Sequence, residues 1–246
     1  MRNLLSRLFK LFLLILLAPL IFSCAVETLL FLSSGLDIGP LDFFLIGFAG
    51  YVLLHGAILY APGGRLFSNL QFIRTLRHEL THSIAGMVFG RRIDEMLVIN
   101  PVGKTGAVVS HVKYIGASGL DSLVTLAPYY LPLFTIPLLP LRFLTVSWGR
   151  ELVDFLIGFT LAFHYVSLID ELLLQGFGLR QKDITHTGVV FSYVVIILLN
   201  LLSLALIKAV LHEHLPNAEY ITGFLGRSGE SYLFIFQQLR SLLPGG

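Results

Sequence analysis

The chain has 246 residues, of which 55% are hydrophobic and 13% are charged, and its mean hydropathy is +0.82. Soluble domains carry about 25% charged residues, so this composition indicates a protein whose solvent is lipid. The net charge of +2 gives no support for nucleic-acid binding. Cys24 is the single cysteine, which excludes an internal disulfide framework and a cysteine-based zinc site.

The N-terminal segment has three basic residues among its first ten, followed by an apolar stretch that reaches Cys24. This order is compatible with a cleaved signal peptide. The bulky Phe22 beside the cleavage position, and the apolar sequence that resumes after it, favour a retained first transmembrane helix instead. The basic residues predict that the N-terminus faces the cytoplasm.

A membrane-spanning helix needs about 20 mostly apolar residues. On that rule the sequence predicts a single integral membrane domain over 1–246, an all-α polytopic bundle of about six transmembrane helices. The third predicted span holds ionisable residues at membrane depth, which usually mark function. The fourth contains four prolines, which predict a bent or broken helix. The predicted spans are 9–32, 41–61, 67–90, 119–146, 151–174 and 185–210.

A short β-hairpin is predicted between the third and fourth spans. The apolar runs MLVI and AVVSHV flank NPVGKTG, a segment rich in turn-forming residues. Six crossings would put the basic residues around this hairpin outside, against the positive-inside bias, so the membrane orientation stays open. The sequence thus divides into two N-terminal helices (1–66), a core (67–210) and a tail (211–246). The tail contains the amphipathic segment SYLFIFQQLRSLL, expected on the membrane surface or against the bundle.

The third span contains the motif HELTH. His78 and His82 stand four residues apart, so both imidazoles project from one face of a helix and can bind one zinc ion (Zn2+) at about 2.0–2.1 Å. Glu79 can then act as the general base toward an activated water and pass the proton to the leaving amine. The alternative is a polar patch among helices, which in lipid needs compensation from its neighbours Arg74 and Arg77.

The segment HELTHSIAGMVFGRRIDEMLVI resembles the site-2 protease family of intramembrane zinc metallopeptidases. A membrane helix with the zinc motif is followed by the small residue Ala85, by Gly90 and by a β-hairpin. The resemblance covers residues 67–210 and implies that the hairpin holds the substrate as an added strand. The chain departs from the family at Thr81, where many members have glycine, and after Pro128, where an asparagine is often found.

A catalytic zinc has three protein ligands and a water, so two histidines leave one ligand to be found. The resemblance implies an aspartate at the start of a later transmembrane helix, and Asp183 fits that description. Counting the crossings places Asp183 on the same side of the membrane as the metal end of the third span. Asp170, at the end of the fifth span, is on that side too and stays an alternative, as do His186 and His164.

These features predict an intramembrane zinc endopeptidase in a cell or inner membrane, acting on transmembrane or membrane-anchored proteins. Two other functions stay open. One is a non-catalytic membrane scaffold or assembly factor that keeps the metal site, and the other is a zinc-dependent hydrolase of a lipid. The hairpin favours the peptidase, because a strand edge can pair with an extended peptide. The polar residues His55 and Asn200 in other spans are interpreted as hydrogen-bonded residues between helices.

Overall fold

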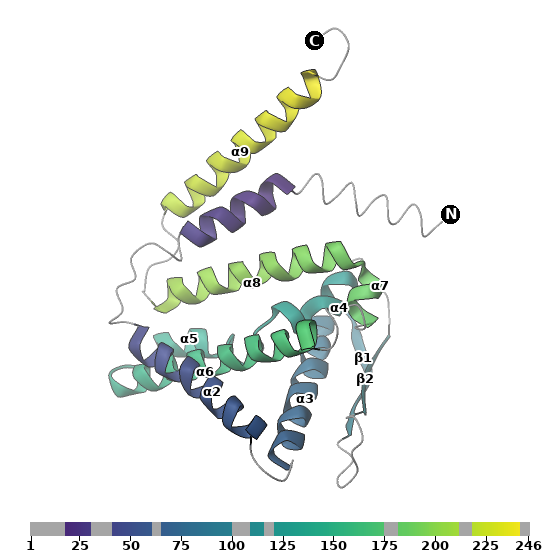
Figure 1. Cartoon of the computed structure of the whole chain (residues 1–246), viewed down its shortest axis with the longest axis vertical. Coiled ribbons are helices and arrows are strands. Elements are labelled where there is room, and N and C mark those ends of the chain that lie inside the picture. Colours follow the sequence, from purple (N-terminus) through teal and green to yellow (C-terminus); the bar gives the residue numbers. More distant parts are fainter. Residues whose placement is uncertain are drawn as a thin grey trace. The chain divides into compact units, whose positions relative to one another are not determined.

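Most of the chain is helical, with an antiparallel pair of strands inserted between two helices (Figure 1). A computed structural model describes residues 18–30, 41–60, 65–99, 109–115, 121–174, 182–211 and 218–241. Helices of this kind satisfy their own backbone groups, which a chain in lipid requires. The predicted mostly helical class with a hairpin insertion is confirmed.

Within the described residues, three helices are long and apolar enough to cross a membrane. They are α2 (Asp42–Tyr60), α6 with the turn that follows it (Trp148–Leu172) and α8 (Val189–Leu211). They match the second, fifth and sixth predicted spans to within a few residues. The first predicted span is a helix over Ala18–Leu30, and the remainder of it lies outside the described residues. The described residues therefore do not show six spans.

The third and fourth predicted spans differ from simple apolar helices. The third is the continuous helix α3 (Arg65–Val88), whose ionisable residues lower its hydropathy. The fourth is not one helix but two short ones, α4 (Asp121–Tyr130) and α5 (Leu138–Phe143). Turns that use the Pro132 carbonyl as an acceptor separate them, because proline cannot donate the bond that would continue the helix. The predicted break is thus confirmed.

The predicted sixth span also begins differently. A short helix, α7 (Lys182–Thr187), precedes α8 and is separated from it by Gly188. The φ angle of Gly188 is +106°, a conformation that side-chain-bearing residues rarely adopt. The continuous helix predicted from residue 185 is therefore wrong at its start, and Asp183 lies on an element of its own.

The hairpin consists of β1 (Arg92–Ile99) and β2 (Val109–Ile115), paired from Arg92 opposite Ile115 to Ile99 opposite Val109. The predicted hairpin is confirmed, and its turn lies outside the described residues. Gly90, with φ +80°, ends α3 and redirects the chain into β1.

β2 approaches α3 closely at Gly86. A Cβ atom at this position would lie 2.5 Å from the Tyr114 ring, so the absence of a side chain makes room for the strand. Arg91 donates its backbone N–H to the Gly86 carbonyl at 2.8 Å and lies over the Tyr114 ring at 5.0 Å. The end of α3 and the hairpin are therefore fixed against each other.

The chain divides into two compact units, one of residues 39–192 and the other of residues 1–38 with 193–246. The first contains α2 to α7 and the hairpin. In the second, Glu27 of the N-terminal helix pairs with Arg227 of α9 (Ala218–Ser241) at 2.8 Å. α9 begins well before the amphipathic segment predicted in the tail, because its first half packs Gly223 against Glu27.

Candidate metal centre

His78 and His82 lie one turn apart on α3, as their spacing predicts. Their Nε2 atoms are 3.2 Å apart, and their rings meet edge to face with centroids 4.8 Å apart. Both Nε2 atoms point to one place, so a single cation can be bound by both rings.

Asp183 of α7 supplies an oxygen to the same place. Its Oδ2 atom lies 3.5 Å from His78 Nε2 and 3.6 Å from His82 Nε2. Donors about 2.0–2.1 Å from a tetrahedral zinc ion are about 3.3 Å from one another. The three observed separations are close to that value, and the group could hold a metal ion.

The other candidates for the third ligand have different partners. Asp170 pairs with Arg74 of α3 and lies 3.8 Å from His55 Nε2. The Nδ1 atom of His164 faces Arg77 at 3.1 Å, and His186 is exposed on α7. The geometry therefore selects Asp183 from the alternatives that the sequence left open.

The two imidazoles also have partners on the side away from the shared point. His82 Nδ1 lies 3.1 Å from the Val124 carbonyl of α4, and His78 Nδ1 lies 3.3 Å from Glu171 Oε2. An acceptor at Nδ1 keeps the proton there and leaves Nε2 free to bind a metal ion. Glu171 was not predicted as part of the site.

Asp183 accepts a hydrogen bond from the Tyr129 hydroxyl at 3.2 Å, and Tyr129 is fully buried. Burial alone disfavours the charged carboxylate, but hydrogen bonds and charges from His78 and His82 outweigh it and hold the pKa of Asp183 below its ordinary range. The carboxylate is therefore ionised at neutral pH, as a metal ligand must be. Tyr129 directly follows Pro128 on α4 and was not predicted as part of the site.

Glu79 lies beside the metal group and contacts the hairpin. Its Oε1 atom accepts a hydrogen bond from the Ser110 hydroxyl of β2 at 2.7 Å. A cavity of about 270 Å3 is lined by Glu79, by the three candidate ligands and by His111, Val112 and Tyr114 of β2. The predicted general base, the predicted ligands and the hairpin thus meet around one space.

The two faces of β2 have different environments. Ser110 and Tyr114 alternate with His111 and Lys113 along the strand. Tyr114 packs on α3, and burial raises the pKa of its hydroxyl to about 12. Lys113 pairs with Glu95 at 2.6 Å on the exposed face, and its charge and hydrogen bond lower the pKa of Glu95. The face of β2 that carries Ser110 and Tyr114 therefore contacts α3.

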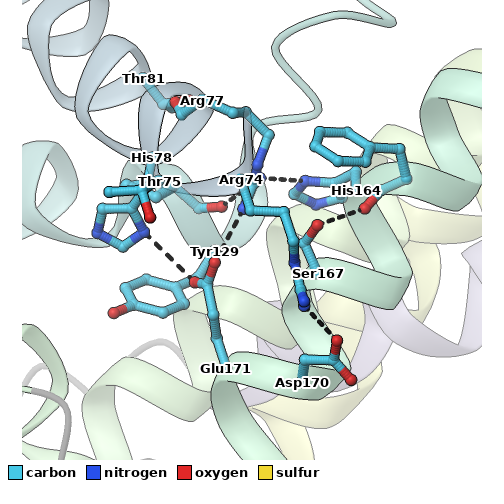
Figure 2. Close-up of polar contacts among 12 residues, drawn as sticks. Arg74, Thr75, Arg77, His78, Thr81, Tyr129, His164, Ser167, Asp170 and Glu171 are labelled. Carbon is cyan, nitrogen blue, oxygen red and sulfur yellow. Dashed lines mark hydrogen bonds and ion pairs between the residues drawn. The ribbon is translucent and has the colours of Figure 1, made fainter. Parts of the chain in front are cut away.

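Ion pairs join α3 to the π-helical turn η2 (Asp170–Leu174), which continues α6 (Trp148–Ile169). Figure 2 shows Arg74 bound to Asp170, and Arg77 of the same helix face bound to Glu171. The compensation that the two arginines require in an apolar setting thus comes from two adjacent carboxylates.

Comparison with protein-family models, curated proteins and solved structures finds no match to this chain. The resemblance to site-2 proteases therefore stays a prediction that rests on the HELTH motif, the hairpin after it and the arrangement of the candidate ligands.

Proposed function

We propose that the protein is an intramembrane zinc-dependent endopeptidase of the site-2 protease type. The observation that supports this most is the group of His78, His82 and Asp183 with Glu79 in one cavity. Two imidazoles and one carboxylate, with room for a further ligand, are the donor set of a catalytic zinc. Zinc bound there would supply Lewis-acid activation of the peptide carbonyl and of a water molecule.

Glu79 is the general base in this proposal. Ser110 fixes one of its oxygens, which orients the carboxylate at the edge of the cavity. Glu79 takes a proton from the attacking water and delivers it to the nitrogen of the leaving amine. The protein thereby supplies both proton transfers of peptide hydrolysis with a single side chain.

The hairpin supports a peptide substrate over a lipid. β2 contributes three residues to the cavity, and among the described strands it pairs with β1 alone. An extended peptide can use the other edge of β2 through backbone hydrogen bonds, whereas a lipid has no such ladder. The substrate in this proposal is an unwound segment of a transmembrane or membrane-anchored protein.

The three apolar helices among the described residues support a membrane setting. We propose that α3 and further segments also cross, giving about six spans in a cell or inner membrane. Pairing of Arg74 and Arg77 with acidic partners lowers the free-energy cost of placing α3 there.

The substitution Glu79→Gln tests the proposal in the purified full-length protein. Cleavage of single-span substrates should fall by roughly 10^3-fold, while about one zinc per chain stays bound, because the general base is lost and the ligands are kept. The matched control is Glu95→Gln, which changes an exposed carboxylate of β1 and should keep both cleavage and zinc.

Cleavage that survives Glu79→Gln would contradict the general-base role. Less than about half a zinc per wild-type chain would contradict the catalytic metal centre, since catalytic sites hold their metal tightly. One zinc per chain without any cleavage would favour the scaffold that keeps the metal site. Release of fatty acid from lipid vesicles, without peptide cleavage, would favour the lipid hydrolase.

A further inference from the structure

The carboxylate of Glu171 lies between His78 and Arg77, as Figure 2 shows. Its Oε1 atom accepts a hydrogen bond from Arg77 at 3.2 Å, and its Oε2 atom lies 3.3 Å from His78 Nδ1. Oε2 is buried, and the His78 imidazole is the partner that it faces. The two oxygens of Glu171 therefore contact two different residues of α3.

Arg77 holds Glu171 in place. It is 1% exposed, and its guanidinium also contacts the Pro128 carbonyl and His164 Nδ1, both at 3.1 Å. Contacts with three separate elements fix the guanidinium plane, so the carboxylate bound to it has little freedom to turn. The rigid unit next to His78 is thus an anchored ion pair rather than a free carboxylate.

The π-helical turn explains how two adjacent acidic residues reach two different arginines. η2 starts at Asp170, directly where α6 ends, and wide turns of this kind are frequent at functional sites. Asp170 binds Arg74, while Glu171 binds Arg77 and faces His78. Two carboxylates that are neighbours in sequence therefore have separate partners, and one of them is directed at the metal centre.

We propose that Glu171 is a positioning residue for His78. Its carboxylate fixes the ring so that Nε2 faces His82 and Asp183, on the side opposite to Glu171 itself. Carboxylate, histidine and metal then form the chain that commonly orients an imidazole ligand. This inference rests on the proposed metal centre and assigns Glu171 no contact with the substrate.

The test is titration of the purified full-length protein with Co2+, followed by the visible absorption of the bound ion. Substituting an outer partner of a metal-bound histidine typically weakens metal affinity by roughly 10- to 100-fold. Glu171→Ala should therefore weaken Co2+ binding by an amount in that range. Glu171→Gln keeps one acceptor oxygen for Nδ1 and should weaken Co2+ binding less. The spectrum of the bound Co2+ should also change, because the ring is no longer held at a single angle.

Asp170→Asn is the matched control, because it changes the neighbouring carboxylate of the same turn, which binds Arg74 instead. It should keep the wild-type Co2+ affinity and spectrum even where it lowers thermal stability. If Glu171→Ala does not fold, the comparison of Glu171→Gln with Asp170→Asn carries the test. Wild-type affinity and spectrum in a Glu171 variant would overturn the positioning role.

The outcome for Glu171 is separable from that for the proposed function. A wild-type chain that binds Co2+ and cleaves no peptide would contradict the peptidase and leave the Glu171 test intact. A wild-type chain that binds no Co2+ would contradict the metal centre itself, and the role of Glu171 with it.

Discussion

Each candidate ligand depends on one residue behind it for its orientation. One ligand contacts a backbone carbonyl, and the other two contact side chains from other elements. Mutation can remove the two side-chain contacts. The three pairs are His82 with the Val124 carbonyl, His78 with Glu171, and Asp183 with Tyr129. Supports of this kind act on metal affinity without touching the metal.

Tyr129→Phe should weaken metal binding by roughly tenfold, because it removes the hydrogen bond that the hydroxyl donates to Asp183 Oδ2. The matched control is the next residue: Tyr130→Phe removes a hydroxyl that donates to the Leu123 carbonyl at 3.2 Å. Zinc affinity measured by competition with a chromophoric chelator should fall in the first variant alone. Equal affinities in the two variants would show that the Tyr129 hydroxyl does not support the site.

Local spacing was sufficient to predict part of this site. His78, Glu79 and His82 follow from one helical turn, which is a property of adjacent residues. Asp183 was one of several alternatives, and distances between atoms were needed to select it. Glu171 and Tyr129 were missed because their contacts join residues far apart in the chain, and no local pattern encodes such contacts.

At the scale of the elements, α2 and α6 approach each other through two glycines. A Cβ atom at Gly47 would lie 2.0 Å from the Phe155 carbonyl oxygen, and one at Gly158 would lie 1.9 Å from that of Phe44. Contacts this short leave no room for a methyl group, so the two backbones meet directly. Small residues serve the same purpose where helices pack in membranes.

Gly47→Ala should lower the stability of the protein by about 1–3 kcal/mol, because the added methyl group forces α2 away from α6. Gly56→Ala is the matched control on the same helix, since a Cβ there meets nothing within 4 Å and alanine favours the helix. Thermal unfolding in detergent should show an earlier transition for Gly47→Ala and an unchanged or later one for Gly56→Ala. An unchanged transition for Gly47→Ala would mean that the helices do not pack in this way.

The elements themselves were mostly predictable from the sequence. The prolines predicted the break between α4 and α5, and the segment NPVGKTG predicted the hairpin, because helix breaking and turn formation depend on local sequence. The separation of α7 from α8 at Gly188 was missed, since a glycine in an apolar run does not reveal a positive φ angle. The π-helical turn was missed as well, because its acidic residues form ion pairs with α3, which is far away in the sequence.

At the scale of the whole molecule, the place of α3 decides where hydrolysis would occur. Composition marks α2, α6 and α8 as apolar enough to cross a membrane. α3 has 24 residues, about 36 Å at 1.5 Å per residue, which exceeds a hydrocarbon core of about 30 Å. Its arginines pair with carboxylates at the end of α6, and paired charges cost less at membrane depth than free ones. A test by length and composition does not count these ion pairs, because they form only in the folded protein.

Single-cysteine labelling should therefore show that α2 and α3 both cross. The chain has one cysteine, so Cys24→Ser gives a background without thiols. Cysteines at Asp42, the first residue of α2, and at Asp94, in β1, should react with an impermeant reagent from one side of the membrane. A cysteine at Gly63, between the two helices, should react from the other side. Reaction of the Gly63 and Asp94 positions from the same side would mean that α3 does not cross. The metal group would then lie outside the bilayer, and any peptide substrate would have to be cut at the membrane surface.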